Sequence, residues 1–338
     1  MHAGRHYALR EIIFWTRREI YILVLLGSIP TLLFEMWHIR LTIPWLPIAL
    51  IGTAVAFMVG FKNNATYGRL WEARQIWGSI VNASRSWGIL VKDFVTLQNS
   101  AISSTEELKK IHSRLIYRHL GWLTALRFQL REPRVWENIN QSYNVEYRSH
   151  HYKIPEYENK LEPELSKFLS DDEFKYVLSK KNRATQIINL QSQDLRILNE
   201  QGLIDNFRHV EMENMLINLY DQQGKCERIK NFPYPRQFAT LNLYFAWLFA
   251  LLVPFGTLQE FDKLGDHYVW LTIPFTVLIC WVFLTMEKIG EASENPFEGM
   301  PNDVPMAALS RTIEIDLREM LDEKEVPPPL TAVNNILM

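Results

Sequence analysis

Hydrophobic residues are concentrated in two blocks near the ends of the 338-residue chain. The first block holds an apolar run at 21–37, interrupted only by Glu35, and an uncharged run at 43–61. The second block holds the runs 238–256 and 268–286. Each run is close to the roughly 17–25 residues that a helix needs to cross a bilayer core. Core helices of soluble proteins usually keep a polar face, which these runs lack. The pattern therefore predicts four transmembrane helices.

The region between the two blocks is too long to be a loop. Apolar residues recur there at three- and four-residue spacing in Leu108–Phe128, Ile187–Leu198 and Glu211–Tyr220, which is the period of amphipathic helices. No alternating strand pattern of any length interrupts them. After the last run we expect an irregular segment at Asn295–Pro305, a helix at Met306–Leu321, and a disordered tail introduced by three consecutive prolines. The sequence thus predicts an all-α integral membrane protein.

Lysine and arginine are frequent beside the ends of these runs and rare in the two predicted hairpin loops, which hold only Arg40 and Lys263. By the positive-inside rule both termini and the central region face the cytoplasm, in a multi-pass protein of the cell membrane. We divide the chain into a cytoplasmic or interfacial N-terminal helix (1–20), transmembrane helices 1 and 2 (21–61), a helical cytoplasmic domain (62–237), transmembrane helices 3 and 4 (238–286), and a cytoplasmic C-terminal segment with its tail (287–338).

Composition narrows the possible functions. A net charge of -2 and the lack of a basic stripe among aromatic residues give no case for nucleic acid binding. The sequence has no glycine-rich phosphate loop, no Gly-x-Ser-x-Gly elbow and no Cys/His metal spacing, so we expect no enzyme activity, no cofactor and no metal. The two cysteines, Cys226 and Cys280, have no disulfide spacing. A membrane enzyme would also need clustered ionisable residues within the spans.

The second span carries the most informative pattern. Thr53, Phe57 and Phe61 recur every four residues and form a slowly drifting stripe on one helical face. Polar sequence follows directly, beginning with Lys62, so this helix must leave the membrane while shielded by neighbours. The stripe alone fits a helix-packing surface or the lining of a pore.

Three motifs resemble those of the bestrophin family, and together they cover nearly the whole chain. They are GFKNNATYGRLWEARQIWGSIVNASR at 60–85, the Cys-Glu-Arg-Ile sequence at 226–229 followed by Pro233 and Pro235, and EKIGEASENPF at 287–297. The resemblance to bacterial bestrophin homologues implies a homopentamer embedded in membrane lipid, whose second helices line a central pore.

Carried over to this sequence, the neck of the pore would be Thr53, Phe57 and Phe61, where Thr53 replaces the usual isoleucine. Lys62 and Asn64 would form the neck exit. The family has a second constriction in the cytoplasmic region, and three residues are candidates for it: Ile204, Arg208 and Val210.

The resemblance implies passive conduction of small monovalent ions, with chloride or other anions favoured. A bacterial channel selective for sodium or other monovalent cations is the first alternative, and a membrane-anchored scaffold or receptor is the second. Animal members bind calcium through a dense acidic run after Asn-Pro-Phe. Here that stretch offers only Glu298 and Asp303, whereas calcium prefers six to eight oxygen ligands, so we expect no calcium gating.

Overall fold

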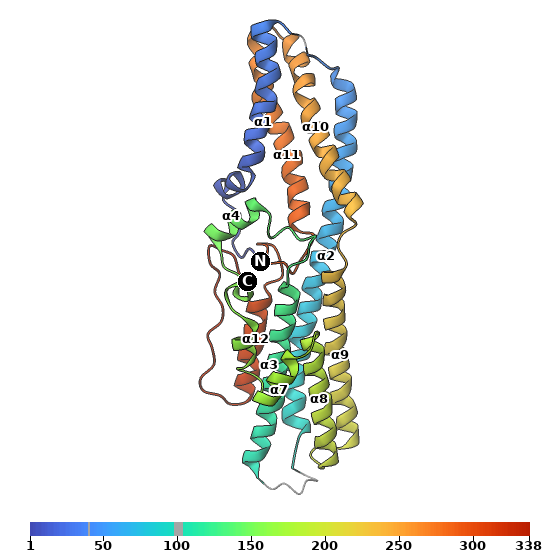
Figure 1. Ribbon diagram of the computed structural model, residues 1–338, viewed down its shortest axis with the longest axis vertical. Coiled ribbons are helices and arrows are strands. Elements are labelled where there is room, and N and C mark those ends of the chain that lie inside the picture. Colours follow the sequence, from blue (N-terminus) through green and yellow to red (C-terminus); the bar gives the residue numbers. More distant parts are fainter. Residues whose placement is uncertain (40, 98–103) are drawn as a thin grey trace.

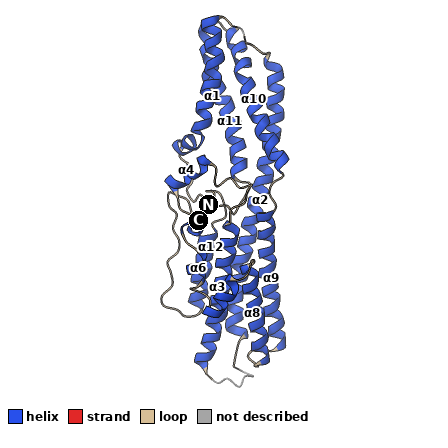
Figure 2. Cartoon of the chain, in the orientation of Figure 1, coloured by secondary structure: helices blue, strands red, loops and turns tan. Residues whose placement is uncertain are grey.

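The computed structural model describes residues 1–39, 41–97 and 104–338, and the described chain is all-α (Figure 1, Figure 2). Within these residues extended pairing is limited to isolated bridges. The long helices are α1 (Leu9–Trp37), α2 (Trp45–Phe94), α3 (Thr105–Arg131), α8 (Arg183–Glu200), α9 (Asn206–Asn231), α10 (Arg236–Asp262), α11 (Thr272–Ala292) and α12 (Met306–Met320). The short ones are α4 (Ser142–His151), α5 (Pro155–Glu158), α6 (Leu161–Leu165), α7 (Asp171–Leu178) and the 3-10 helix η1 (Asp266–Leu271). The predicted all-α class is confirmed.

Four helices among the described residues are long and apolar enough to cross a membrane: α1, α2, α10, and α11 together with η1. They correspond to the four predicted runs, and each extends beyond its run. Between 22% and 39% of their most apolar windows is buried within the chain, so most of that apolar surface faces outward. Such a surface requires lipid or another subunit against it. The chain is therefore a multi-pass membrane protein.

The membrane half has its own core, formed by side chains of α1, α2, α10 and α11. Its buried members include Leu23, Ile48, Val55, Phe249 and Leu284. Gly52 allows α2 to approach α10 closely, because a Cβ at this position would lie 2.6 Å from Cε2 of Phe249. Small residues at such contacts are how membrane helices gain packing without a hydrophobic driving force.

The other half, called the cytoplasmic half because the charge distribution of the sequence predicts that side, is a larger helical bundle of α2, α3, α8, α9 and α12. Trp77, Trp87 and Trp122 are fully buried at its centre. The indole of Trp122 donates to Oε1 of Gln223 at 2.9 Å, which satisfies one of the buried polar groups of this core. The predicted amphipathic helices lie within α3, α8 and α9, and the predicted helix at Met306–Leu321 is α12.

One helix joins the two halves. α2 has 50 residues, or about 75 Å at 1.5 Å per residue, and runs through most of the length of the molecule (Figure 1). No break occurs where the uncharged run ends at Phe61 and polar sequence begins. Its upper half packs on α10 and α11 and its lower half on α9 and α12. α2 therefore contributes to the packing of both halves.

The predicted disorder of the tail is wrong. Ile336 and Met338 are buried, and the last residues pair with the first: the N–H of Leu337 donates to the carbonyl of Met1 at 2.8 Å, and that of Ala3 to the carbonyl of Asn335. The N–H of Ala308, in the first turn of α12, donates to the carbonyl of Met338. Proline-rich composition predicts local disorder, whereas these are contacts between distant segments.

Candidate functional site

An exposed apolar stripe follows one face of α2 in the membrane half. Thr53, Phe57 and Phe61 are all exposed, and the two phenylalanine side chains are 65% and 72% accessible. The Thr53 hydroxyl donates to the carbonyl of Ala49 at 2.9 Å, so its hydrogen is used within the helix. Rings this large are rarely left open to water in a finished assembly. This face therefore lacks part of its environment in the single chain.

The stripe continues into the cytoplasmic half with a different chemistry. At 100° per residue, Asn64, Gly68, Gln75, Gly78 and Asn82 project from the same side of α2 as Thr53. All five are exposed, and a Cβ added at Gly68 or Gly78 would meet nothing within 4 Å. One continuous face of α2 is thus apolar from Thr53 to Phe61 and mostly small and polar below it, where the exposed side chains of Trp71 and Arg85 also project from this side.

Lys62 does not belong to this face, so its expected place at the neck exit is wrong. It lies half a helical turn away from Thr53, is only 2% exposed, and its Nζ donates to Oε1 of Glu287 at 2.5 Å. Asn64, the other expected exit residue, is exposed on the stripe. The period of the helix by itself places Lys62 and Asn64 on nearly opposite sides of α2. The match to the family motif gives only their positions in the sequence and does not separate them.

The three sequence motifs meet at this level of the molecule. From the first motif, Lys62 pairs with Glu287 of the third, and Arg69 donates to the carbonyls of Glu294 (2.9 Å) and of Ile229 in the second motif (3.0 Å). Arg236, just after the second motif, pairs with the buried carboxylate of Glu294 at 2.8 Å. The charges of the motifs are therefore used to join α2, α9, α10 and α11 where the chain leaves the membrane.

A close approach of α2 to the backbone of α11 further stabilises the junction of these helices. The side-chain amide of Asn63 donates to the carbonyl of Met286 at 3.1 Å, and a Cβ at Gly290 would lie 2.2 Å from Oδ1 of the same Asn63. Only glycine leaves room for that amide. This contact explains the glycine in Glu-Lys-Ile-Gly, the start of the third motif.

The candidates for the cytoplasmic constriction have different environments. Ile204 is 2% exposed and belongs to the cytoplasmic core, so its assignment to the constriction is wrong. Arg208 is partly exposed, pairs with Asp205 at 3.2 Å and contacts the carbonyl of Phe94 at 3.4 Å. Val210 is 57% exposed on α9. Phe207 was not among the candidates, yet it is 88% exposed in the first turn of α9. A large apolar residue two positions after the N-cap Asp205 was the sequence feature that could have pointed to it.

Glu298 and Asp303 are buried in the loop between α11 and α12, where both accept backbone hydrogen bonds. Oε2 of Glu298 accepts from the N–H of Asn138 at 2.8 Å, and Oδ2 of Asp303 from those of Gly299 and Met300 at 2.8 and 2.9 Å. Burial raises the pKa of both carboxyl groups, and their mutual repulsion adds to that of Glu298. One oxygen of each carboxyl group therefore holds the loop in shape, while Oε1 of Glu298 and Oδ1 of Asp303 are buried and accept no hydrogen bond from the described residues.

The whole chain matches known proteins along nearly its entire length. The model of the family described as "Bacterial/Fungal Bestrophin protein" matches residues 11–319. The chain belongs to this bestrophin family. Among curated bestrophin relatives, the protein named "Voltage-dependent anion channel-forming protein YneE" of Escherichia coli K12 is 28% identical over 309 residues, which are 90% of this chain and 87% of that protein. A Ralstonia nicotianae protein named in the same way, RSc3414, is 27% identical over 280 residues, covering 82% and 77%.

Solved structures agree with the fold of this bestrophin. A bacterial bestrophin homologue from Klebsiella pneumoniae has a TM-score of 0.73 at 23% identity, covering 91% of this chain and 99% of that one. A variant of the same homologue has a TM-score of 0.72 at 23% identity, covering 93% and 100%. At this identity the likeness establishes the fold.

Proposed function

We propose that this chain is one subunit of a homopentameric anion channel in the cell membrane, with α2 of each subunit facing a central conduit. The single observation that carries the proposal is the exposed stripe of α2, apolar from Thr53 to Phe61 and mostly small and polar below. A lone helix cannot enclose a conduit, so the stripe functions only when copies close into a ring. Ring closure would also cover the exposed phenylalanine side chains.

The expectation that the chain is not an enzyme agrees with its family, since its curated relatives are named channel-forming proteins. Those names also favour anions as the permeating species. Lys62 is turned inward, so the stripe of α2 carries no fixed charge between Thr53 and Trp71, whereas Arg85 farther down pairs with Asp316 at 2.8 Å. A ring of Arg208 residues in the cytoplasmic half would favour anions, moderated by the Asp205 carboxylate paired with each guanidinium.

The stripe suits a neck that controls ion passage by excluding water. Apolar side chains supply no ligands to replace the hydration shell of an ion, so a narrow apolar ring impedes all ions. Selectivity then depends on the cytoplasmic end, where Arg208 and Val210 remain as constriction candidates. A sodium-conducting channel and a membrane-anchored scaffold are the two alternatives to be separated by experiment.

The decisive experiment is planar-bilayer recording of the purified protein under asymmetric KCl. We expect currents whose reversal potential lies near that of chloride. Reversal near the potassium potential would replace the anion channel with a cation channel, and no current from a verified oligomer would favour the scaffold. Native mass measurement in detergent tests the pentamer, and monomers or dimers alone would contradict it.

A further inference from the structure

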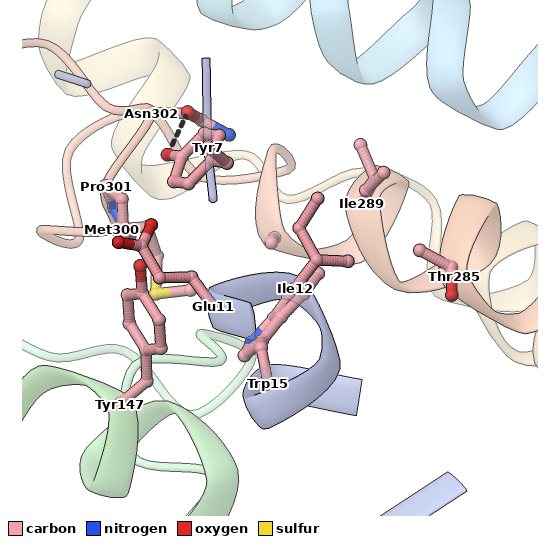
Figure 3. A pocket seen from close by; sticks show the side chains of 11 residues that line it. Tyr7, Glu11, Ile12, Trp15, Tyr147, Thr285, Ile289, Met300, Pro301 and Asn302 are labelled. Atoms are coloured by element: carbon pink, nitrogen blue, oxygen red, sulfur yellow. Dashed lines mark hydrogen bonds between the residues drawn. The ribbon is translucent and has the colours of Figure 1, made fainter. Parts of the chain in front are cut away.

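A second site lies at the cytoplasmic edge of the membrane half, away from the stripe of α2. It is a cavity of ≈ 210 Å³ between the start of α1, the end of α11, α4 and the loop after α11 (Figure 3). Apolar cavities of about 150 Å³ already accept a benzene molecule, so this space is large enough for a small ligand. None of its lining residues belongs to α2.

The lining combines aromatic rings with one carboxylate. Tyr7, Trp15 and Tyr147 contribute rings, and Glu11 contributes the acid. In Figure 3 the Glu11 carboxylate and the Tyr147 hydroxyl point to the same region, next to Met300. Tyr7 is fixed by a 3.0 Å hydrogen bond to Oδ1 of Asn302. Most of the remaining wall is aliphatic, including Ile12 and Ile289.

The charge of Glu11 is not neutralised within the described chain. Its side chain makes no hydrogen bond or ion pair with any residue that the structure describes. Burial, and then the negative charge of Glu11, raises the pKa of Tyr147 to about 12, so this phenol stays neutral at physiological pH. The cavity therefore places one carboxylate without a charged partner among the described residues between aromatic walls.

An ammonium group already occupies the neighbouring position. Nζ of Lys288 lies 4.9 Å from the ring centroid of Trp15 and 3.9 Å from that of Tyr143, and it pairs with Glu19 at 2.7 Å. Here α1 and α4 hold a cation with two aromatic rings and a carboxylate. The cavity offers a similar set of groups around the same Trp15, with Tyr147 in place of Tyr143 and with Glu11, about two helical turns before Glu19, as the carboxylate.

We propose that the cavity bounded by Tyr7, Glu11, Trp15 and Tyr147 binds an organic cation, that is, an ammonium group on an apolar body. Aromatic faces attract such cations, with most effect when water is excluded. The aliphatic wall accepts the apolar body, and a location at the membrane surface suits an amphipathic molecule. The same chemistry is offered by the headgroup of phosphatidylethanolamine and by free amphiphilic amines.

The test is calorimetric titration of the purified full-length oligomer, in neutral detergent at pH 7, with benzyltrimethylammonium. Its uncharged isostere, neopentylbenzene, is the matched ligand control. We expect the cation to bind and Glu11→Gln to weaken it about tenfold, while Glu319→Gln, which removes an exposed carboxylate outside the cavity, leaves affinity unchanged. Equal affinity of the wild type and Glu11→Gln, or equal binding of the isostere, would overturn the proposal.

Ile289→Phe tests the location independently, because it fills the cavity from α11 and leaves all charges in place. We expect it to abolish binding with the oligomer intact, and unchanged binding would place the site elsewhere and overturn the proposal. Titration in nanodiscs with and without phosphatidylethanolamine separates the two sources. Weaker apparent binding in its presence supports the lipid headgroup, and equal binding supports a free amine.

Discussion

The Nζ of Lys62 and the Oε1 of Glu287 lie 2.5 Å apart, and both side chains are almost completely buried where α2 and α11 leave the membrane. The pair joins two residues separated by 225 positions in the sequence. Replacing one member of a buried ion pair leaves the charge of the other uncompensated. The resulting loss of folding stability is far larger than the net stability that the intact pair contributes.

We therefore expect Lys62→Met to destabilise the protein by about 3–5 kcal/mol and to lower its melting temperature in detergent. The double variant Lys62→Met with Glu287→Leu should recover part of the loss, because Glu287 no longer leaves a buried charge unpaired, while the buried Glu294 loses Lys62 at 3.9 Å but keeps its pair with Arg236. Lys324→Met, at an exposed lysine without a partner in the described chain, is the control and should melt like the wild type. A single variant as stable as the wild type would mean that Glu287 is readily protonated or hydrated.

Phe57→Ala together with Phe61→Ala should give larger currents from an intact oligomer. Removing the rings widens an apolar neck, while alanine keeps the helix stable. Ion preference should change less than conductance, since no charge is altered. If the stripe instead packs against another helix, the same change opens cavities and assembly is lost, at a cost of roughly several kcal/mol. Bilayer conductance and size-exclusion profiles distinguish the two outcomes.

Stability should fall as pH rises from about 4 to about 6 because of Asp303. Burial raises its pKa from 3.8 to about 6, despite the nearby Arg131, so the folded state holds this proton more tightly than the unfolded chain. The contribution is fully present below pH 3.8 and is lost as pH rises through about 6, by at most about 1.4 kcal/mol per pH unit.

Asp303→Asn isolates this contribution, because the amide oxygen can still accept from Gly299 and Met300 but cannot ionise. Thermal melts of the variant should lose part of the pH dependence in this window, whereas Asp221→Asn, at an exposed site, should keep it. Identical pH profiles for Asp303→Asn and the wild type would assign the titration to another group, with Glu298 the first to examine.

Micromolar calcium should change neither the currents nor the melting temperature. Few carboxylates follow Asn-Pro-Phe, so the segment offers too few oxygen ligands for calcium. In addition, Glu298 and Asp303 each use one carboxylate oxygen to accept hydrogen bonds from backbone N–H groups. Titration with calcium in a chelator-buffered series measures the effect. A shift in melting temperature of more than the replicate error would show that the loop can rearrange to accept the ion.

The sequence by itself determined the membrane helices, because an uncharged run near 19 residues has one low-energy arrangement in a bilayer, a helix with all its backbone groups bonded internally. It also determined α3, α8 and α9 through the period of their apolar residues. Since α2 is a regular helix, the period of the sequence was sufficient to place Thr53, Phe57 and Phe61 on one face. The same period turns Lys62 away, although its position in the motif had suggested a neck exit.

Only the tertiary structure decided what lies between distant segments. Ile204 is buried because the turn between α8 and α9 folds onto the cytoplasmic core, and no local pattern reveals this. Ile336 and Met338 are ordered because residues 1–3 and α12 supply their partners, although the prolines before them predict disorder. The cavity beside Glu11 likewise exists only where four segments meet. Local propensity fixes the helices, but burial and charge pairing depend on which surfaces come together, and that depends on the whole chain.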